Sequence, residues 1–233
     1  MSEATFTQLL DLACGGFLLA AVIVLWRREL TAIIQVFALQ GLALAAIPLL
    51  LGLHEHRADL VAVAAGIAAL RAGLLPYLMR RALIASAPAE DRGRRHREGS
   101  DERRETQPVV NVAASLLTAA MLTLLAYAVA QPLVALDPTP ATRALPVGLA
   151  VVLIGFFVLA TRRRALAQVV GFLLLDNGIT ATAFLAASGV PLIVELGVSF
   201  DVLLAVLVLQ ILTTRMRTAF GTTDLDDLRE LAD

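Results

Sequence analysis

The hydrophobic residues of this chain fall into long apolar runs separated by short polar or arginine-containing links. Most runs are roughly 20 residues long, the length that an α-helix needs to cross the hydrocarbon core of a bilayer. No run alternates polar and apolar residues, as the strands of an outer-membrane barrel would. We therefore predict an all-α, polytopic integral membrane protein with seven transmembrane helices, at residues 6–25, 30–53, 59–79, 109–134, 145–160, 166–187 and 191–214.

The polar segments between these runs divide the chain into five predicted regions. The segment at 86–107 has no apolar face, and we interpret it as a solvated connector, with contact to anionic lipid headgroups as the alternative. No basic segment precedes the first run, so we expect an uncleaved span there. The regions are transmembrane helices 1–3 in 1–85, a charged cytoplasmic loop at 86–107, helix 4 in 108–137, helices 5–7 in 138–217 and a cytoplasmic tail at 218–233. A proline-containing link at 136–146 leads into the fifth predicted helix.

The composition agrees with a membrane protein, because 58% of the 233 residues are hydrophobic, against about 45–50% in soluble domains. The 19 basic residues are all arginine, and their placement predicts the orientation. With the N-terminus outside, 16 arginines lie on the inner side and only Arg57 and Arg143 on the outer side, while Arg71 lies inside a span. Cytoplasmic loops carry the excess of positive charge, so we predict an N-out, C-in topology.

Three carboxylic acids, Asp176, Glu195 and Asp201, lie within the last two apolar runs, and Arg71 lies within the third. A charge at the bilayer centre costs about 2.5–3.5 kcal/mol on insertion scales, and such residues commonly serve ion or proton movement. From the helical rise, Arg71, Asp176 and Asp201 each lie about 15–18 Å from a membrane surface, so they share a level near the midplane. A lateral row of acid, base and acid is a usable proton relay, because the base controls whether each acid is ionised.

These charged residues also have structural interpretations. Arg71 could pair statically with Asp176 or Asp201 and fix only the register of the helices. Glu195 lies about 6 Å from the outer surface, close enough for its side chain to reach the headgroups. Asn177, beside Asp176, is placed to donate an interhelical hydrogen bond and would support the row.

A faint internal repeat relates residues 27–52 to residues 164–189. Both segments begin with arginine, end with glycine and contain a polar–glycine pair, Gln40-Gly41 in the first and Asn177-Gly178 in the second. Spans 1–3 would then repeat as spans 5–7 in the same orientation, with the acids retained only in the second copy and Gln40 as the counterpart of Asn177. Chance similarity between apolar sequences is the alternative.

No motif for redox or hydrolytic chemistry is present. The only cysteine, Cys14, lies within an apolar run, and the two histidines His54 and His56 in one link are too few ligands for a metal site. We expect no metal, no cofactor, no nucleic-acid partner and no catalysis by this chain alone.

The runs GFLLLDNG and PLIVELGVSFDVLLAVLVLQI, within 166–214, resemble the hydrogenase-4 component E family. Its last three spans are in turn similar to the NuoK-type subunit of respiratory complex I and the MrpC-type subunit of multisubunit cation/proton antiporters. The resemblance implies a non-catalytic, multi-pass subunit in a prokaryotic plasma membrane, within a group 4 hydrogenase complex. Its partners would be antiporter-like membrane subunits and the membrane anchor subunit. A purely structural subunit or an MrpC-like antiporter subunit are the alternatives.

The resemblance also implies roles for individual acids. Asp201 matches the second proton-path glutamate of NuoK-type subunits, because Gln210 and a basic closing run follow it at the expected spacing. The first glutamate would fall at Leu173, whereas the acid here, Asp176, lies nearly one helical turn further on. The acid-Asn-Gly arrangement of the hydrogenase family fits residues 176–178, with Asp in place of the usual Glu. Glu195 would be an outer branch of the path.

Overall fold

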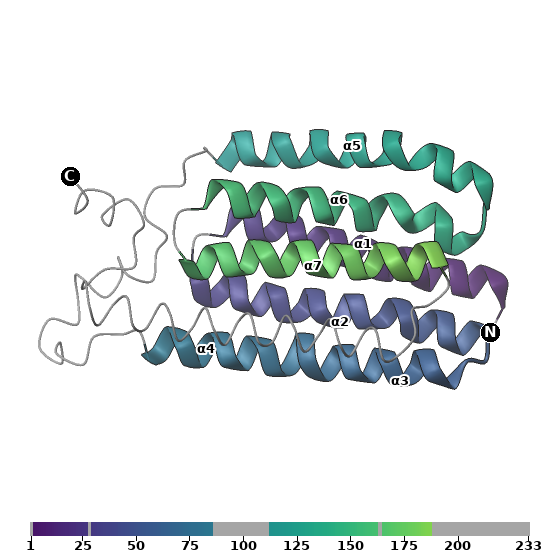
Figure 1. The fold of residues 1–233 in the computed structure, drawn as a ribbon, viewed down its shortest axis with the longest axis horizontal. Helices are drawn as coiled ribbons and strands as arrows, with labels where there is room; N and C mark the ends of the chain where they lie inside the picture. Colours follow the sequence, from purple (N-terminus) through teal and green to yellow (C-terminus); the bar gives the residue numbers. More distant parts are fainter. Residues whose placement is uncertain (1, 28, 86–111, 163–164, 188–233) are drawn as a thin grey trace, which may run out of the picture.

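The computed structural model describes residues 2–27, 29–85, 112–162 and 165–187, which are helical apart from short links. Figure 1 shows the helices side by side in an elongated bundle, with the chain reversing direction at each end. The elements are α1 (Glu3–Trp26), α2 (Leu30–His54), α3 (Ala58–Ile67), the π-helical segment η1 (Ala68–Leu74), α4 (Leu75–Ala85), α5 (Val112–Leu136), α6 (Pro140–Thr161) and α7 (Ala165–Ala187).

The all-helical fold class is confirmed by this arrangement. Among the described residues, six helices are long and apolar enough to cross a membrane, with α3, η1 and the first part of α4 forming one of them. They correspond to the first six predicted spans. The seventh, at 191–214, lies outside the described residues, so the count of seven and the N-out orientation stay predictions.

The predicted start of the fifth span at residue 145 is wrong, because α6 begins at Pro140. The sequence had suggested a proline-containing link through this region. Thr139 instead caps the helix: its side chain accepts a hydrogen bond from the Thr142 backbone N–H, and the Thr142 hydroxyl accepts one from the Thr139 N–H. A proline at the first helical position loses only an N–H that has no partner within the helix, so Pro140 starts the helix without cost.

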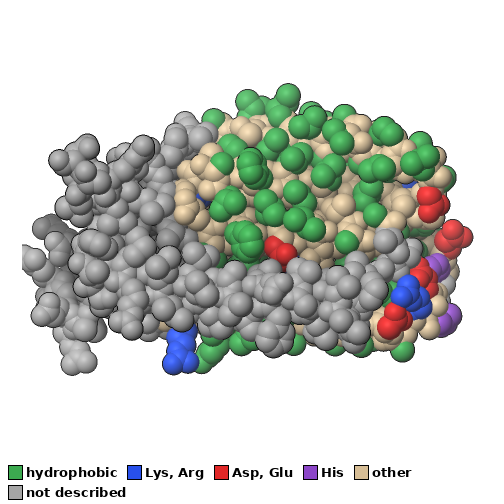
Figure 2. Space-filling view, in the orientation of Figure 1, with side chains coloured by type: hydrophobic (Ala, Val, Ile, Leu, Met, Phe, Trp, Pro, Cys, Tyr) green, Lys and Arg blue, Asp and Glu red, His purple; other side chains and the backbone are tan. Residues whose placement is uncertain are grey.

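Two helices, α2 and α6, organise the packing. Helix α2 packs against α1, α3, η1 and α7, and α6 packs against α5, α7 and α1. Figure 2 shows hydrophobic side chains spread over the visible described surface, with the histidines and most of the acidic side chains at the N-terminal end of the bundle. An acidic side chain also shows at mid-bundle, and a basic one towards the opposite end. The largest apolar side chains that are fully buried are Phe17, Phe37, Phe184, Leu10, Ile33, Leu44, Ile47, Leu51, Leu60, Ile67 and Leu75.

Helices α6 and α7 approach closely through glycines on both helices. A Cβ added at Gly178 of α7 would lie 2.5 Å from the backbone nitrogen of Val152, and one added at Gly171 would lie 2.6 Å from that of Leu159. Small residues let membrane helices come into backbone contact. Gly178 directly follows Asp176 and Asn177, so this seam fixes the part of α7 that carries the polar residues. Gly148 and Gly155 of α6 meet the α7 backbone in the same way.

The third span widens into a π-helix at η1, where the N–H of Leu75 donates to the carbonyl of Leu70, five residues back. Pro76 explains the position of this segment, because in an α-helix its ring would clash with the carbonyl four residues earlier, at Ala72. The wider turn also aligns residues that are four apart. In a regular α-helix each step of four residues turns the side chain by about 40° around the helix axis, so a series of such positions drifts off one face. Here the positions four apart are all buried: Ile67, Arg71, Leu75 and Met79.

Candidate functional site

The most deeply buried charge among the described residues is Arg71, which is 1% exposed and lies on η1. Its guanidinium faces three side chains of α7. Nη1 donates to the Asn177 Oδ1 at 2.5 Å, and Nη2 donates to the Thr180 Oγ1 at 2.9 Å. Nη1 also lies 2.8 Å from the Asp176 Oδ2. Residues 176, 177 and 180 of a helix share one side, so α7 presents its acceptors to Arg71 as a group, here called the Arg71 cluster.

A third helix joins the Arg71 cluster through Gln40 of α2. The Asn177 Nδ2 donates to the Gln40 Oε1 at 3.1 Å, and both side chains are at most 1% exposed. Within the described part of the chain, the Gln40 Nε2 has no hydrogen-bond partner. Gly41 lets α2 approach η1 closely, because a Cβ there would lie 2.9 Å from the backbone of Arg71. Gln40 and Asn177 are the equivalent positions of the predicted repeat, and they meet at the centre of the bundle.

Asp176 lies at the edge of the Arg71 cluster. Its side chain is 12% exposed, against 2% for Arg71. The Nη1–Oδ2 contact is an ion pair by distance, whereas the aligned hydrogen bond from Nη1 goes to Asn177. Among the described residues, the Asp176 Oδ2 accepts no hydrogen bond. This oxygen therefore keeps lone pairs with which it can accept a proton or a hydrogen bond.

The Arg71 cluster pairs one positive with one negative charge. In a buried ion pair, each charge offsets the free-energy cost of taking the other out of water. Removing one partner therefore lowers stability, typically by about 3–5 kcal/mol. Proton binding to Asp176 would leave Arg71 with the neutral acceptors Asn177 and Thr180. The arrangement can therefore couple the protonation of one carboxylate to the charge balance between the third span and α7.

The structure brings together four of the six predicted site residues: Arg71, Asp176, Asn177 and Gln40. Their contacts confirm that Arg71 and Asp176 share a level, while their role in proton movement stays a prediction. Glu195 and Asp201 lie outside the described residues.

Thr180 is a member of the Arg71 cluster that the sequence reasoning missed. Its position four residues after Asp176, on the same helical face, was the available signal. A threonine in an apolar run is ordinary, so it attracted no attention.

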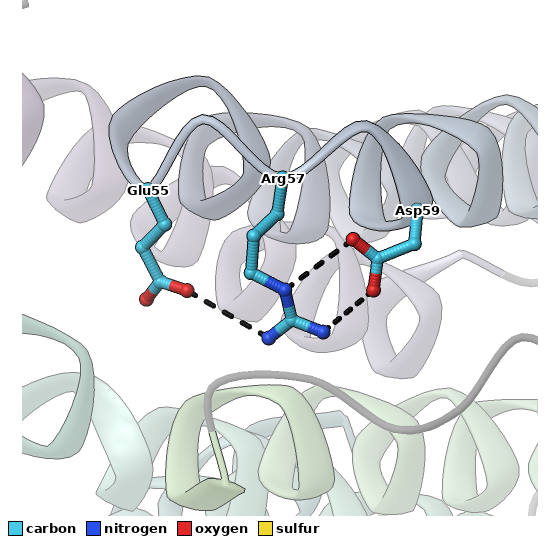
Figure 3. Close-up of polar contacts among 3 residues, drawn as sticks. All are labelled: Glu55, Arg57 and Asp59. Atoms are coloured by element: carbon cyan, nitrogen blue, oxygen red, sulfur yellow. Dashed lines mark hydrogen bonds and ion pairs between the residues drawn. The ribbon is translucent and has the colours of Figure 1, made fainter.

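A second arginine cluster lies at the end of the bundle, in the link between α2 and α3 (Figure 3). Arg57 donates from Nη2 and Nε to the two carboxylate oxygens of Asp59, at 2.6 and 3.3 Å, and Glu55 lies 3.8 Å from Nη1. The hydrogen bond with Asp59 raises the pKa of the Arg57 guanidinium above its ordinary value. These side chains are between 32% and 52% exposed.

Comparison with known proteins finds similarity along the whole chain and along half of it. The uncharacterised protein Rv0085 of Mycobacterium tuberculosis is 52% identical over 233 residues, which is 100% of both chains. Hydrogenase-4 component E of Escherichia coli K12 is 33% identical over 119 residues, 51% of this chain and 55% of that protein. The component E proteins of Escherichia coli O157:H7 and Shigella flexneri match to the same extent.

Neither of the other two comparisons finds a relative. No protein-family profile matches the chain, and no solved structure matches it significantly.

Proposed function

The chain belongs to the family of the Mycobacterium tuberculosis protein Rv0085, and we propose that it is a non-catalytic membrane subunit of a hydrogenase-type complex related to complex I. The partial similarity to hydrogenase-4 component E supports the kind of complex. The six membrane-length helices support a multi-pass subunit. In this proposal the subunit lies in the plasma membrane beside antiporter-like subunits and the membrane anchor of the hydrogenase, and other chains carry the redox chemistry.

The proposed contribution of this chain is a proton path through Asp176, Asp201 and Glu195, with Arg71 controlling the charge of Asp176. The observation that carries this proposal is the buried contact between Arg71 and Asp176 at the meeting point of three helices. Proton paths in membrane proteins use ionisable side chains that face the interior of a helix bundle. Asn177 and Gln40 would hold the path open as a polar connection between α7 and α2.

The proposed topology has seven spans, with the last three similar to NuoK-type subunits, the N-terminus outside and the C-terminus inside. The described helices alternate in direction, so their links fall at two ends. Arg57 and Arg143 lie at the end with the N-terminus, while four described arginines, Arg27, Arg80, Arg81 and Arg162, lie towards the opposite end. This asymmetry supports the same orientation as the whole sequence.

The proposal is tested in the assembled complex. An affinity-tagged full-length chain is expressed in its native host, and inverted membrane vesicles are assayed for proton uptake driven by the redox reaction of the complex. Asp176→Asn and Asp201→Asn should each lower proton uptake at least several-fold relative to electron transfer, because neither amide can carry a proton. Asp59→Asn is the matched control, since Asp59 is exposed at the end of the bundle.

Different results overturn different parts of the proposal. If the tagged chain purifies without any hydrogenase-type subunit, the membership in such a complex is wrong. If both variants assemble and couple normally, these acids do not belong to a proton path. If they fail only in assembly, the subunit is structural, and the static Arg71–Asp176 pair is its explanation.

A further inference from the structure

Helix α1 carries its polar residues on the face that points out of the bundle. Its buried face is apolar, with Phe6, Leu10, Cys14, Phe17, Ala21 and Val24 among the buried residues. The opposite face contains Gln8, Asp11 and Gly15, which are exposed, together with Leu12 and Leu19 at 72% and 59% exposure. Residues spaced by three and four positions share one side of a helix, so these side chains form a continuous strip, here called the α1 outer face.

Asp11 lies along α1 inward from the polar end of the bundle, the end that carries the N-terminus. The ring of Phe6 stacks on that of His54, the last residue of α2, with ring centroids 4.1 Å apart. Phe6 is therefore level with the end of α2, and Asp11 lies about 7.5 Å further along the axis of α1. Its exposed neighbours Leu9 and Leu12 belong to the apolar surface. Neither Gln8 nor Asp11 forms an ion pair or a side-chain hydrogen bond with a described residue.

The α1 outer face also has room for a close neighbour. A Cβ added at Gly15 or Gly16 would meet no described residue within 4 Å, and glycines on a membrane helix allow a second backbone to approach closely. The outward face of α5 provides the contrast, since its large exposed side chains at mid-helix are hydrophobic and include no charged residue: Leu117, Met121, Leu124, Leu125, Tyr127 and Val129. A lipid-facing surface has the composition of α5. Polar and ionisable residues within spans face other protein instead, and the α1 outer face carries residues of this kind.

We propose that the α1 outer face docks a transmembrane helix of a partner subunit, and that this helix carries an arginine or lysine at the level of Asp11. The charge of Asp11 selects the occupant, because an acid among apolar side chains requires a basic or hydrogen-bond-donating partner. A second copy of this chain fits less well. Two copies meeting through this face around a two-fold axis would bring each Asp11 towards the other, and like charges repel. This inference does not depend on the proton path.

The experiment uses site-specific photo-crosslinking of the full chain in native membranes. The photoreactive amino acid benzoylphenylalanine replaces Leu12 of α1 or, as the matched control, Leu124 of α5. Leu12 should give one discrete protein adduct, and mass spectrometry should identify an apolar peptide that contains arginine or lysine. Leu124 should give no such adduct. Adding Asp11→Leu should lower the Leu12 yield about tenfold, the effect of losing one interhelical polar contact, while Asp59→Asn should leave it unchanged.

Several outcomes would overturn the proposal. Equal yields at Leu12 and Leu124 would mean that the α1 outer face contacts lipid. An adduct to a second copy would make the face a homodimer interface, and one to residues 188–233 of the same chain would make it an internal contact. An adduct to a peptide without a basic residue, or a yield that is unchanged by Asp11→Leu, would show that Asp11 does not bind a basic residue of the partner helix. Gly15→Leu adds a matched steric test, since it should abolish the adduct while Ala128→Leu on α5 should not.

Discussion

Arg71 and Arg57 each form an ion pair with an aspartate, but in opposite surroundings. The Arg71 and Asp176 side chains are 2% and 12% exposed, whereas those of Arg57 and Asp59 are 40% and 52% exposed. The exposed pair has the better hydrogen-bond geometry, with two aligned bonds between one guanidinium and one carboxylate (Figure 3). Geometry alone would therefore rank Arg57 as the more important residue.

The surroundings reverse that ranking. Water competes for both partners of an exposed pair and salt screens them, so such pairs contribute little to stability. A buried pair is not strongly stabilising in itself, but each partner alone is costly to leave in an apolar interior. The difference between the two clusters lies in the penalty for breaking them, and the following predictions measure that penalty.

The largest effect is expected from removing one charge of the buried pair. Arg71→Met should lower the free energy of unfolding by about 3–5 kcal/mol, because it leaves the Asp176 carboxylate buried without its counter-charge. The measurement is thermal unfolding of the purified protein in detergent, followed by circular dichroism. The double variant Arg71→Met, Asp176→Leu should recover much of the loss, since it removes both charges. A double variant that is less stable than the single one would contradict this account.

A smaller effect is expected at the contact between α2 and η1. Gly41→Ala places a Cβ 2.9 Å from the backbone of Arg71, so one helix must shift, at about 1–3 kcal/mol. Gly73→Ala is the matched control within η1, because among the described residues its Cβ would meet only the carbonyl oxygen of Ala68, at 3.9 Å. Equal unfolding temperatures for the two variants would show that α2 does not rely on this close approach.

Next comes the loss of one acceptor from Arg71. Thr180→Val keeps the shape of the side chain but removes the oxygen that accepts from Nη2, and it should cost about 1–3 kcal/mol. Thr118→Val is a suitable control, because that hydroxyl donates to the carbonyl of Ala114 in its own helix. Denaturation in parallel under identical detergent conditions gives the comparison, and a larger loss from Thr118→Val would contradict the importance of Thr180.

The smallest effect is expected at the exposed pair. Arg57→Ala should leave the unfolding temperature of the protein nearly unchanged, and any difference from the unaltered chain should shrink as salt is added. Unfolding is measured at low and high ionic strength. A loss comparable with that of Arg71→Met would mean that burial does not separate the two clusters.

The sequence predicted the helices and the shared level of Arg71 and Asp176 for the same reason, which is that distance along a spanning helix converts directly into depth. Arg71 and Asp176 could be placed at one level by counting residues from the ends of their spans. The membership of Gln40 was suggested only through the repeat. Hydropathy indicates that a helix crosses a membrane, but it does not say which of its faces meets protein.

The features that escaped prediction depend on contacts between helices. The wide turn at η1 requires knowing that Arg71 must face α7, and Thr180 gains significance only from the arginine opposite it. The start of α6 at Pro140 was missed because a proline usually indicates the interruption of a helix. Only the helix cap at Thr139 shows that this proline occupies the first helical position. The α1 outer face escaped because Asp11 lies near the start of a run and was counted with it.

The π-helical segment also affects how this chain can change length in evolution. A π turn is equivalent to one extra residue inserted into an α-helix, with the helix continuing normally on both sides. Deleting a single residue between Ala68 and Leu74 would restore regular α geometry and turn the two halves of the span against each other. Either Arg71 or the packing residues Leu60 and Val63 would then leave the interior. This stretch of the span is thus intolerant of deletion, and relatives that lack one residue here should also lack the buried arginine.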